Sequence, residues 1–148
     1  ATRMLVAGGE TNGGATASIQ YFTMPIASNA VNFGSLTGSR RNTDGTGDDT
    51  YSIWGGGWVS GSVSNIDYVT TQTTSNASSF GTLWEARNDA GACTDGSRGC
   101  FVGGYQGYST SRRSIIDYVT ISTPGNASTF GNMTSGGNHV QAVSGAAA

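Results

Sequence analysis

Side chains that carry out acid–base or nucleophilic chemistry are few in this chain and form no recognisable catalytic set. Among 148 residues there is one histidine, His139, and there is no lysine. No GxSxG nucleophile elbow occurs, so nothing specifies a catalytic triad among the many serines. Asp67 and Asp117 stand at matching positions of two similar segments, whereas paired carboxyl catalysis needs both groups at one bond. The sequence predicts no catalytic residue and no enzyme.

The acidic loop NTDGTGDD is the best candidate for a metal site. Asp44, Asp48 and Asp49 offer the hard oxygen ligands that Ca²⁺ prefers, on a flexible loop rich in glycine. Their spacing does not match an EF-hand, and a solvated turn is the competing interpretation. We expect no other metal and no cofactor.

Two cysteines, Cys93 and Cys100, flank the segment TDGSRG. Its Asp-Gly and Arg-Gly steps are typical of turns, so the two thiols are expected to face each other across a hairpin. An oxidising compartment would then allow a disulfide that closes a small loop. The alternative is a pair of free, partly buried thiols, and a metal site is disfavoured by the single histidine.

Aromatic residues beside glycine-rich turns are the best candidates for ligand contact. Trp58, Trp84, Tyr105 and Tyr108 have this setting. Exposed aromatic rings pack against the apolar faces of sugars, and they are also enriched in protein interfaces. The four residues are therefore candidates for contact with a glycan or a partner protein, whereas Trp54 corresponds to Phe101 and is expected in the core.

The chain repeats itself three times. Phe-Gly pairs at Phe33, Phe80 and Phe130 are separated by 47 (80 − 33) and 50 (130 − 80) residues, and IDYVT precedes the second and third pairs. Periods of 40–50 residues built from short strands are typical of propeller blades and related β arrays. We therefore divide the single domain, residues 1–148, into three units with approximate bounds 3–50, 51–97 and 98–148.

Each unit is predicted to contain four short strands and no helix. The segment NIDYVT is dense in β-branched and aromatic residues, and its alternation puts apolar side chains on both faces. No segment keeps a helical apolar stripe, because glycine interrupts every candidate. The fold class is all-β, with three four-stranded, propeller-like repeats. The arginine pairs Arg40–Arg41 and Arg112–Arg113 are expected in surface turns, and Asn76 and Asn126 in turns that bond their own backbone.

The strands that end in double glycine, followed by spaced aromatic residues, resemble kelch β-propeller repeats. The fuller unit, RGCFVGGY with IDYVTISTPGNASTFGNMT, is similar to repeats in virion proteins of tailed phages, including marine and cyanobacterial phages. This resemblance implies a virion structural protein, a decoration or fibre-associated module on the particle surface that contacts other virion proteins. A lectin-like module that binds host-surface glycans is the alternative. The copper chemistry of galactose oxidase, a kelch enzyme, is not implied, because copper of that kind needs several imidazole ligands.

Charge and hydropathy exclude two classes of partner. The formal net charge is −2, which provides no electrostatic attraction to nucleic acid. No apolar run approaches the roughly 20 residues that span a bilayer, so we expect no membrane insertion.

The first strand segment and the last segment of the chain predict self-association. VSGAAA falls where a fourth strand leads into the next unit, and ATRMLVAGG corresponds to the first strand of a unit. Unpaired strand edges invite pairing, so we expect a homo-oligomer in which the last strand of one subunit pairs head to tail with the first strand of another. Two subunits would make a six-bladed ring, and more subunits would make a larger ring or an open fibre. The alternative is a compact three-sided β-prism in which the two ends of one chain pair.

Overall fold

The computed structural model describes residues 3–24, 27–107 and 111–144, and it is all-β, as the sequence predicts. A first large sheet contains, in spatial order, β1 (Arg3–Ala7), β4 (Ser18–Thr23) and β5 (Val31–Ser35). Between its first two strands, β2 (Glu10–Thr11) and β3 (Gly14–Ala15) form a small hairpin.

Two further sheets have four strands each. The second sheet contains β6 (Asp44–Gly47), β7 (Tyr51–Gly55), β8 (Asn65–Thr70) and β9 (Ser78–Thr82). The third sheet contains β10 (Gly91–Thr94), β11 (Arg98–Val102), β12 (Arg113–Thr120) and β13 (Ser128–Gly137). All neighbouring strands are antiparallel.

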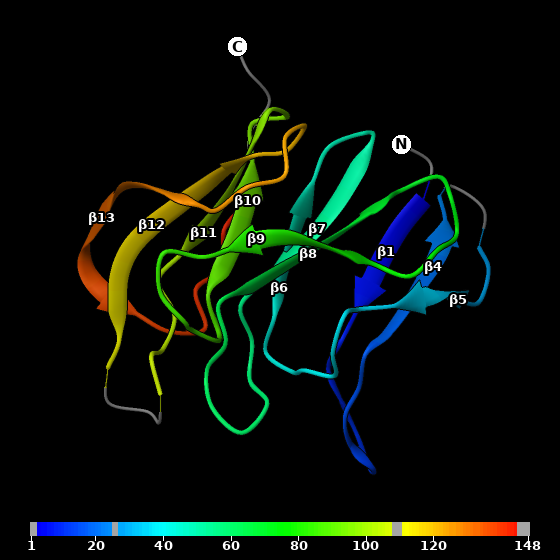
Figure 1. Cartoon of the computed structure of the whole chain (residues 1–148), viewed down its shortest axis with the longest axis horizontal. Coiled ribbons are helices and arrows are strands. Elements are labelled where there is room, and N and C mark those ends of the chain that lie inside the picture. The colour runs from blue at the N-terminus through cyan, green and yellow to red at the C-terminus, as the bar shows by residue number, and fades with distance from the viewer. Residues whose placement is uncertain (1–2, 25–26, 108–110, 145–148) are drawn as a thin grey trace.

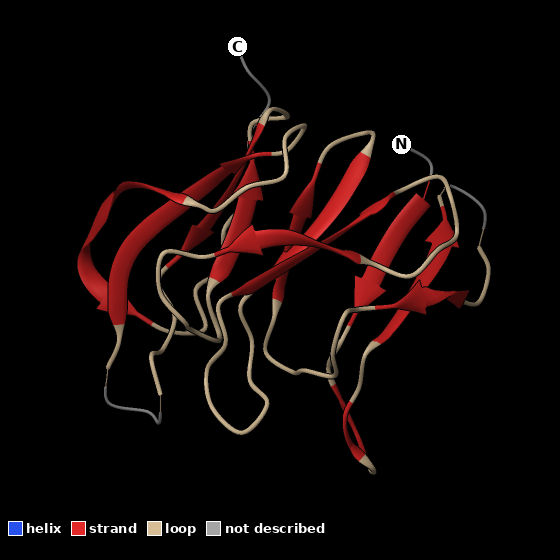
Figure 2. Cartoon of the chain, in the orientation of Figure 1, coloured by secondary structure: helices blue, strands red, loops and turns tan. Residues whose placement is uncertain are grey.

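The three large sheets stand side by side in chain order. Figure 1 shows the second sheet between the first and the third, so the arrangement is an open row. In the described part of the chain, loops and turns connect the strands (Figure 2). In the described part of the chain, β1 pairs only with β4 and β13 only with β12. The described residues therefore include no pairing between the two ends of the chain, which a β-prism requires.

The sheets are offset from the sequence units by one strand. β6, from the end of the first unit, pairs with β7 of the second, and β10 likewise pairs with β11. The first large sheet has no such strand: one edge of β1 pairs with β4, and the other edge has no strand partner among the described residues. β1 is therefore an edge strand where β7 and β11 are interior strands.

The core consists of two layers, one between each pair of neighbouring sheets. Between the first and second sheets the buried residues are Ile19, Phe33, Leu36, Trp54 and Val69. Between the second and third sheets they are Ile53, Ile66, Phe80, Leu83, Phe101, Val119, Ile121 and Ala127. The second sheet is thus covered on both faces, which confirms the prediction from the NIDYVT pattern. Trp54 is in the core, as expected.

Candidate functional site

A buried ion pair holds the third sheet against the second. The Arg87 Nη1 and Asp117 Oδ2 atoms lie 2.9 Å apart, and both side chains are 0% exposed. The backbone N–H of Trp84 donates to Asp117 Oδ2 at 3.0 Å, and Arg87 Nη2 donates to the carbonyl of Phe101 at 3.1 Å. Burial raises the pKa of Asp117 and lowers that of Arg87, because both lose hydration, while their mutual attraction opposes each shift.

The same arrangement holds the second sheet against the first. Arg40 Nη1 lies 3.2 Å from Asp67 Oδ2, and the backbone N–H and hydroxyl of Thr37 donate to the Asp67 carboxylate at 2.8 Å each. Arg40 is buried, so the prediction that it lies in a surface turn is wrong. Its neighbour Arg41 is partly exposed and pairs with Glu10. We use the term joint for each contact between neighbouring sheets: one lies around Arg87 and Asp117, and the other around Arg40 and Asp67.

Burial of the arginine of each joint in an ion pair was not predicted from the sequence, although the repeat contains a pattern that indicates it. Arg40 and Arg87 occupy the same position in the first two units, just as Asp67 and Asp117 do in the second and third. Because each arginine precedes its aspartate by about 30 residues, the ion pair joins two units and cannot be seen within one. Unit-to-unit comparison of charged positions would have found both.

The Phe-Gly pairs also belong to the joints. A methyl group on Gly34 would lie 2.1 Å from the carbonyl oxygen of Ser75, and one on Gly81 would lie 2.2 Å from that of Gly125. Glycine is therefore required where the loop of the next unit crosses. This loop is fixed by Asn76, whose side-chain oxygen accepts from the backbone N–H of Ser35 at 3.1 Å.

Asn126 makes the equivalent bond to the backbone N–H of Thr82, also at 3.1 Å. The prediction that these asparagines bond the backbone of their own turn is wrong, because both reach across to the preceding sheet. They are structural residues, as expected, but they stabilise a joint between sheets.

The two ends of the row present the same positions without a neighbour. Phe130 is 58% exposed, whereas its counterpart Phe80 is 3% exposed. Val6 is 51% exposed, whereas its counterpart Phe101 is fully buried. Around the position of a methyl group on Gly131 no described atom lies within 4 Å, although this glycine corresponds to the crowded Gly81. The first sheet thus carries one half of a joint and the third sheet carries the other half.

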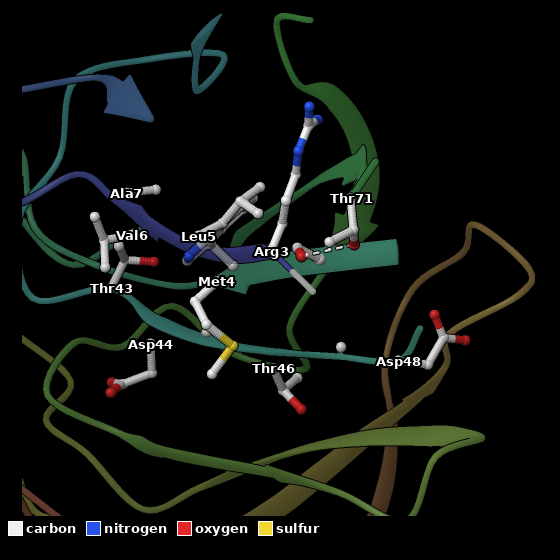
Figure 3. Close-up of a pocket in the computed structure, with 14 residues that line it drawn as sticks. Arg3, Met4, Leu5, Val6, Ala7, Thr43, Asp44, Thr46, Asp48 and Thr71 are labelled. Atoms are coloured by element: carbon white, nitrogen blue, oxygen red, sulfur yellow. Dashed lines mark hydrogen bonds between the residues drawn. The ribbon is translucent and has the colours of Figure 1, made fainter. Parts of the chain in front are cut away.

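The free edge of β1 borders an elongated groove of about 540 Å³. One wall is β1, from Arg3 to Ala7, and the other is the segment 43–48, which includes β6. Figure 3 shows both walls, with Met4 and Val6 on β1 and Asp44 and Thr46 on the other side. The hydroxyls of Ser52 and Thr71, which also line the groove, are hydrogen-bonded to each other at 2.9 Å.

The aromatic candidates do not form a shared site. Trp58 is only 7% exposed, so its ring is not available as a ligand platform, whereas Trp84 is 67% exposed. Tyr105 is half-buried and packs edge-on against His139, with ring centroids 6.2 Å apart. Tyr108 lies outside the described residues.

The acidic candidates for Ca²⁺ do not converge. Asp44 begins β6, while Asp48 accepts hydrogen bonds from the backbone N–H groups of Thr50 and Tyr51 at 2.7 Å each, in the turn after β6 that also holds Asp49. Within the described residues there is no group of three or more metal-binding side chains. The turn interpretation fits this geometry better than the metal interpretation.

One residue of each unit belongs to a polar row; in the first two units this residue comes just before β6 and β10. Asn42, Asp89 and His139 correspond to one another and share a left-handed backbone, with φ values of 56°, 54° and 49°. Asp89 Oδ1 accepts from the Asn42 amide at 2.8 Å and lies 3.3 Å from His139 Nδ1. Burial, followed by repulsion from Asp89, raises the pKa of nearby Asp44 to about 7, and His139 opposes that shift. The row links the three units, and it gives the single histidine a structural contact.

The two cysteines are directly opposite each other in the β10–β11 ladder, as the hairpin prediction requires. Both thiols are free and half-buried in this structure. Burial, together with the neighbouring Cys93, raises the pKa of the Cys100 thiol, which makes the reactive thiolate scarcer at neutral pH. The disulfide in an oxidised sample stays a prediction.

No protein-family model and no curated protein matches this chain. The described part of the chain contains no helix of the length and hydropathy needed to span a bilayer. The joints, the exposed ends of the row and the groove are the features of the molecule that bear on its function.

Proposed function

We propose that this protein is a non-enzymatic structural module that assembles head to tail with copies of itself. One observation carries the proposal. Positions buried in both joints, at Phe80 and Phe101, recur in exposed form at the two opposite ends of the row, at Phe130 and Val6. Two half-joints of complementary type on one molecule are the requirement for a heterologous contact.

The proposed architecture is an incomplete propeller in which each large sheet is one blade. Propellers have about 4–8 blades, so a ring made from whole copies of this three-bladed array closes with two copies and six blades. Each copy would then supply one half-joint at each of two identical contacts. An open fibre is the alternative outcome if the rotation per copy does not close.

The proposed setting is the surface of a tailed-phage particle. Its support is the resemblance of the repeats to those of phage virion proteins. In this setting the protein is a decoration or fibre-associated component, and its partners are its own copies and other virion proteins.

The experiment that tests the assembly is native mass spectrometry over a range of protein concentrations. We expect a species with twice the 15.1 kDa mass of the chain. The matched substitution Phe130→Asp, at an exposed position, should favour the single chain, whereas Trp84→Asp, also exposed but outside the half-joints, should leave the dimer intact. A single chain at every concentration would contradict the proposal.

Glycan binding is the second candidate function, and exposed Trp84 is the observation that favours it. A large exposed indole beside a turn offers the flat apolar surface on which sugars stack. A glycan array tests this proposal: binding that is lost in Trp84→Ala would support it, and absence of binding to every sugar would contradict it.

A further inference from the structure

We infer that residues 141–144 of a second copy fill the groove beside β1 and pair with that strand, completing the first sheet as a four-stranded blade. This inference rests on the proposed head-to-tail assembly and specifies which segment makes the contact. It is a case of β-strand addition, in which the free edge of a sheet accepts an extended segment.

The repeat identifies the occupant. His139 corresponds to Asp89 and Asn42, so Gln141–Ser144 corresponds to β10 and β6. β6 and β10 lie side by side, and the Thr46 hydroxyl donates to the carbonyl of Cys93 at 2.9 Å. Residues 141–144 continue this series, because the backbone N–H of Thr94 donates to Ser144 Oγ at 2.8 Å.

Residues 141–144 lie in line with β6 and β10, which pair with β7 and β11. The segment itself has no strand partner among the described residues. Val143 is 90% exposed there, although its counterparts Thr46 and Cys93 are both half-buried. An apolar side chain at this position is explained by a contact that the single chain does not make.

The groove has the position that such a strand requires. β6 pairs with β7 on one side and lies beside β10 and β11 on the other. One blade earlier, the equivalent space lies between β1 and β6, and there the groove is found. Its volume of about 540 Å³ is within the range of specific binding sites.

The repeat also predicts the register. In the two complete blades Asp44 is opposite Gly55 and Gly91 is opposite Val102. The same register places Val143 of one copy opposite Leu5 of the next, which is the position that Cys93 and Cys100 occupy in the third sheet. The Val143 side chain would lie over Ser52 and Thr71, the counterparts of Gly99 and Ile121. One blade later, a methyl group on Gly99 would lie 2.8 Å from Thr46 Cγ2 and 3.6 Å from Ile121 Cγ1.

The remaining residues of the two half-joints are compatible with this contact. Gly131 of the second copy leaves open the space in which the loop at Ser28 and Asn29 of the first copy would cross, as the loop at Asn126 crosses Gly81. The ion pair is replaced by neutral residues on both sides: Gln20 stands where Asp67 and Asp117 stand, and Gly137 stands where Arg40 and Arg87 stand. Closing the contact therefore buries no unpaired charge at these two positions.

Cysteine cross-linking tests the register. In the full chain with Cys93→Ser and Cys100→Ser, the variant Leu5→Cys/Val143→Cys is treated with dibromobimane, which bridges only thiols that lie close together. We expect a covalent dimer on a denaturing gel. The control Ala7→Cys/Val143→Cys is two residues out of register, so its diagonal pair is farther apart and should cross-link much less.

The outcomes separate this inference from the proposed function. A native dimer without the Leu5–Val143 cross-link would overturn strand insertion and leave the assembly intact. A cross-link within one chain would overturn the second copy as the occupant. A chain that is single at every concentration would overturn both.

A second pair of variants tests the inference without a substitution at Leu5, in case the Leu5→Cys variant does not fold. Val143→Asp changes an exposed side chain and would place a carboxylate in a groove that already contains Asp44 and Asp48. We expect the dimer dissociation constant to rise roughly tenfold or more, with unchanged melting of the single chain. Val59→Asp, also at an exposed valine, should leave the constant unchanged. An equal effect of the two substitutions would overturn the inference.

Discussion

Phe80 and Phe130 occupy the same position in two repeats but have opposite environments. Each ring makes an edge-on contact with the tyrosine of its own unit, with centroids 5.5 Å apart for Phe80 and 5.9 Å for Phe130. Phe80 is buried because the next sheet covers it, and Phe130 is exposed because no described sheet follows. The repeat therefore specifies a surface, and the neighbouring sheet decides whether this surface becomes core.

The charged residues of the joints, unlike the phenylalanines, are not repeated at the ends of the row. A half-exposed phenylalanine costs little, whereas a buried aspartate without its arginine costs several kcal/mol. The repeats keep phenylalanine and glycine at the end of the row but replace the ion pair by Gln20 and Gly137. The ends therefore keep the apolar half of a joint and lose its charged half.

The largest expected effect is the removal of a buried arginine. Arg87→Ala leaves the Asp117 carboxylate buried without its partner, so we expect the free energy of unfolding to fall by about 3–5 kcal/mol. Arg112→Ala, at an exposed arginine in the third unit, should change it by less than about 0.5 kcal/mol. Urea unfolding at pH 7 measures both. Equal effects would show that the joint is not held by this pair.

Truncation of Phe80 should lower the free energy of unfolding about as much as removal of Arg87, whereas truncation of Phe130 should have a much smaller effect. Phe80→Ala opens a cavity between the second and third sheets, and we expect a loss of about 3–5 kcal/mol. Phe130→Ala should cost less than about 1 kcal/mol in the single chain, because most of the ring is already in water. Unfolding is measured at a concentration where native mass spectrometry shows the single chain. Near-wild-type stability of Phe80→Ala would contradict the burial described here.

The smallest effect concerns pH and the polar row between the units. Asp44 has its pKa raised to about 7 in the folded chain from 3.8, so it binds its proton more tightly when folded. Its contribution to stability is present below pH 4 and is lost as the pH rises to about 7. We expect a loss of about 1–2 kcal/mol, less than the roughly 4 kcal/mol of the full shift, because this half-buried carboxyl can rehydrate.

Asp44→Asn should remove this part of the pH dependence and stabilise the chain at pH 8 relative to wild type. Chemical denaturation at pH 4, 6 and 8 measures the difference between the two proteins. His139→Gln removes the group that opposes the shift, so it should move the loss of stability to higher pH. If the difference in unfolding free energy between wild type and Asp44→Asn were the same at all three pH values, Asp44 would not be the source of this pH dependence.

Local pattern predicted the strands well, because strand formation in this chain depends on residues that are close in sequence. β8 and β12 coincide with the IDYVT segments, and the hairpin that places Cys93 opposite Cys100 follows from the turn residues between them. Core membership of Trp54 was found by comparing units. What failed were predictions about residues whose partners lie in another unit: Arg40, Asn76 and Asn126.

The sequence by itself determined the period, the all-β class and the absence of a recognisable catalytic set, because these depend on local propensity and on which side chains exist. Only the tertiary structure decided that the sheets are offset from the sequence units by one strand, so that β6 and β10 belong to the sheet of the next unit and β1 keeps a free edge. Turn residues predict the partner within a hairpin, but backbone hydrogen bonds are donated by any residue except proline, so side-chain identity does not reveal whether a strand has a second partner. The groove beside β1 follows from that choice of partner.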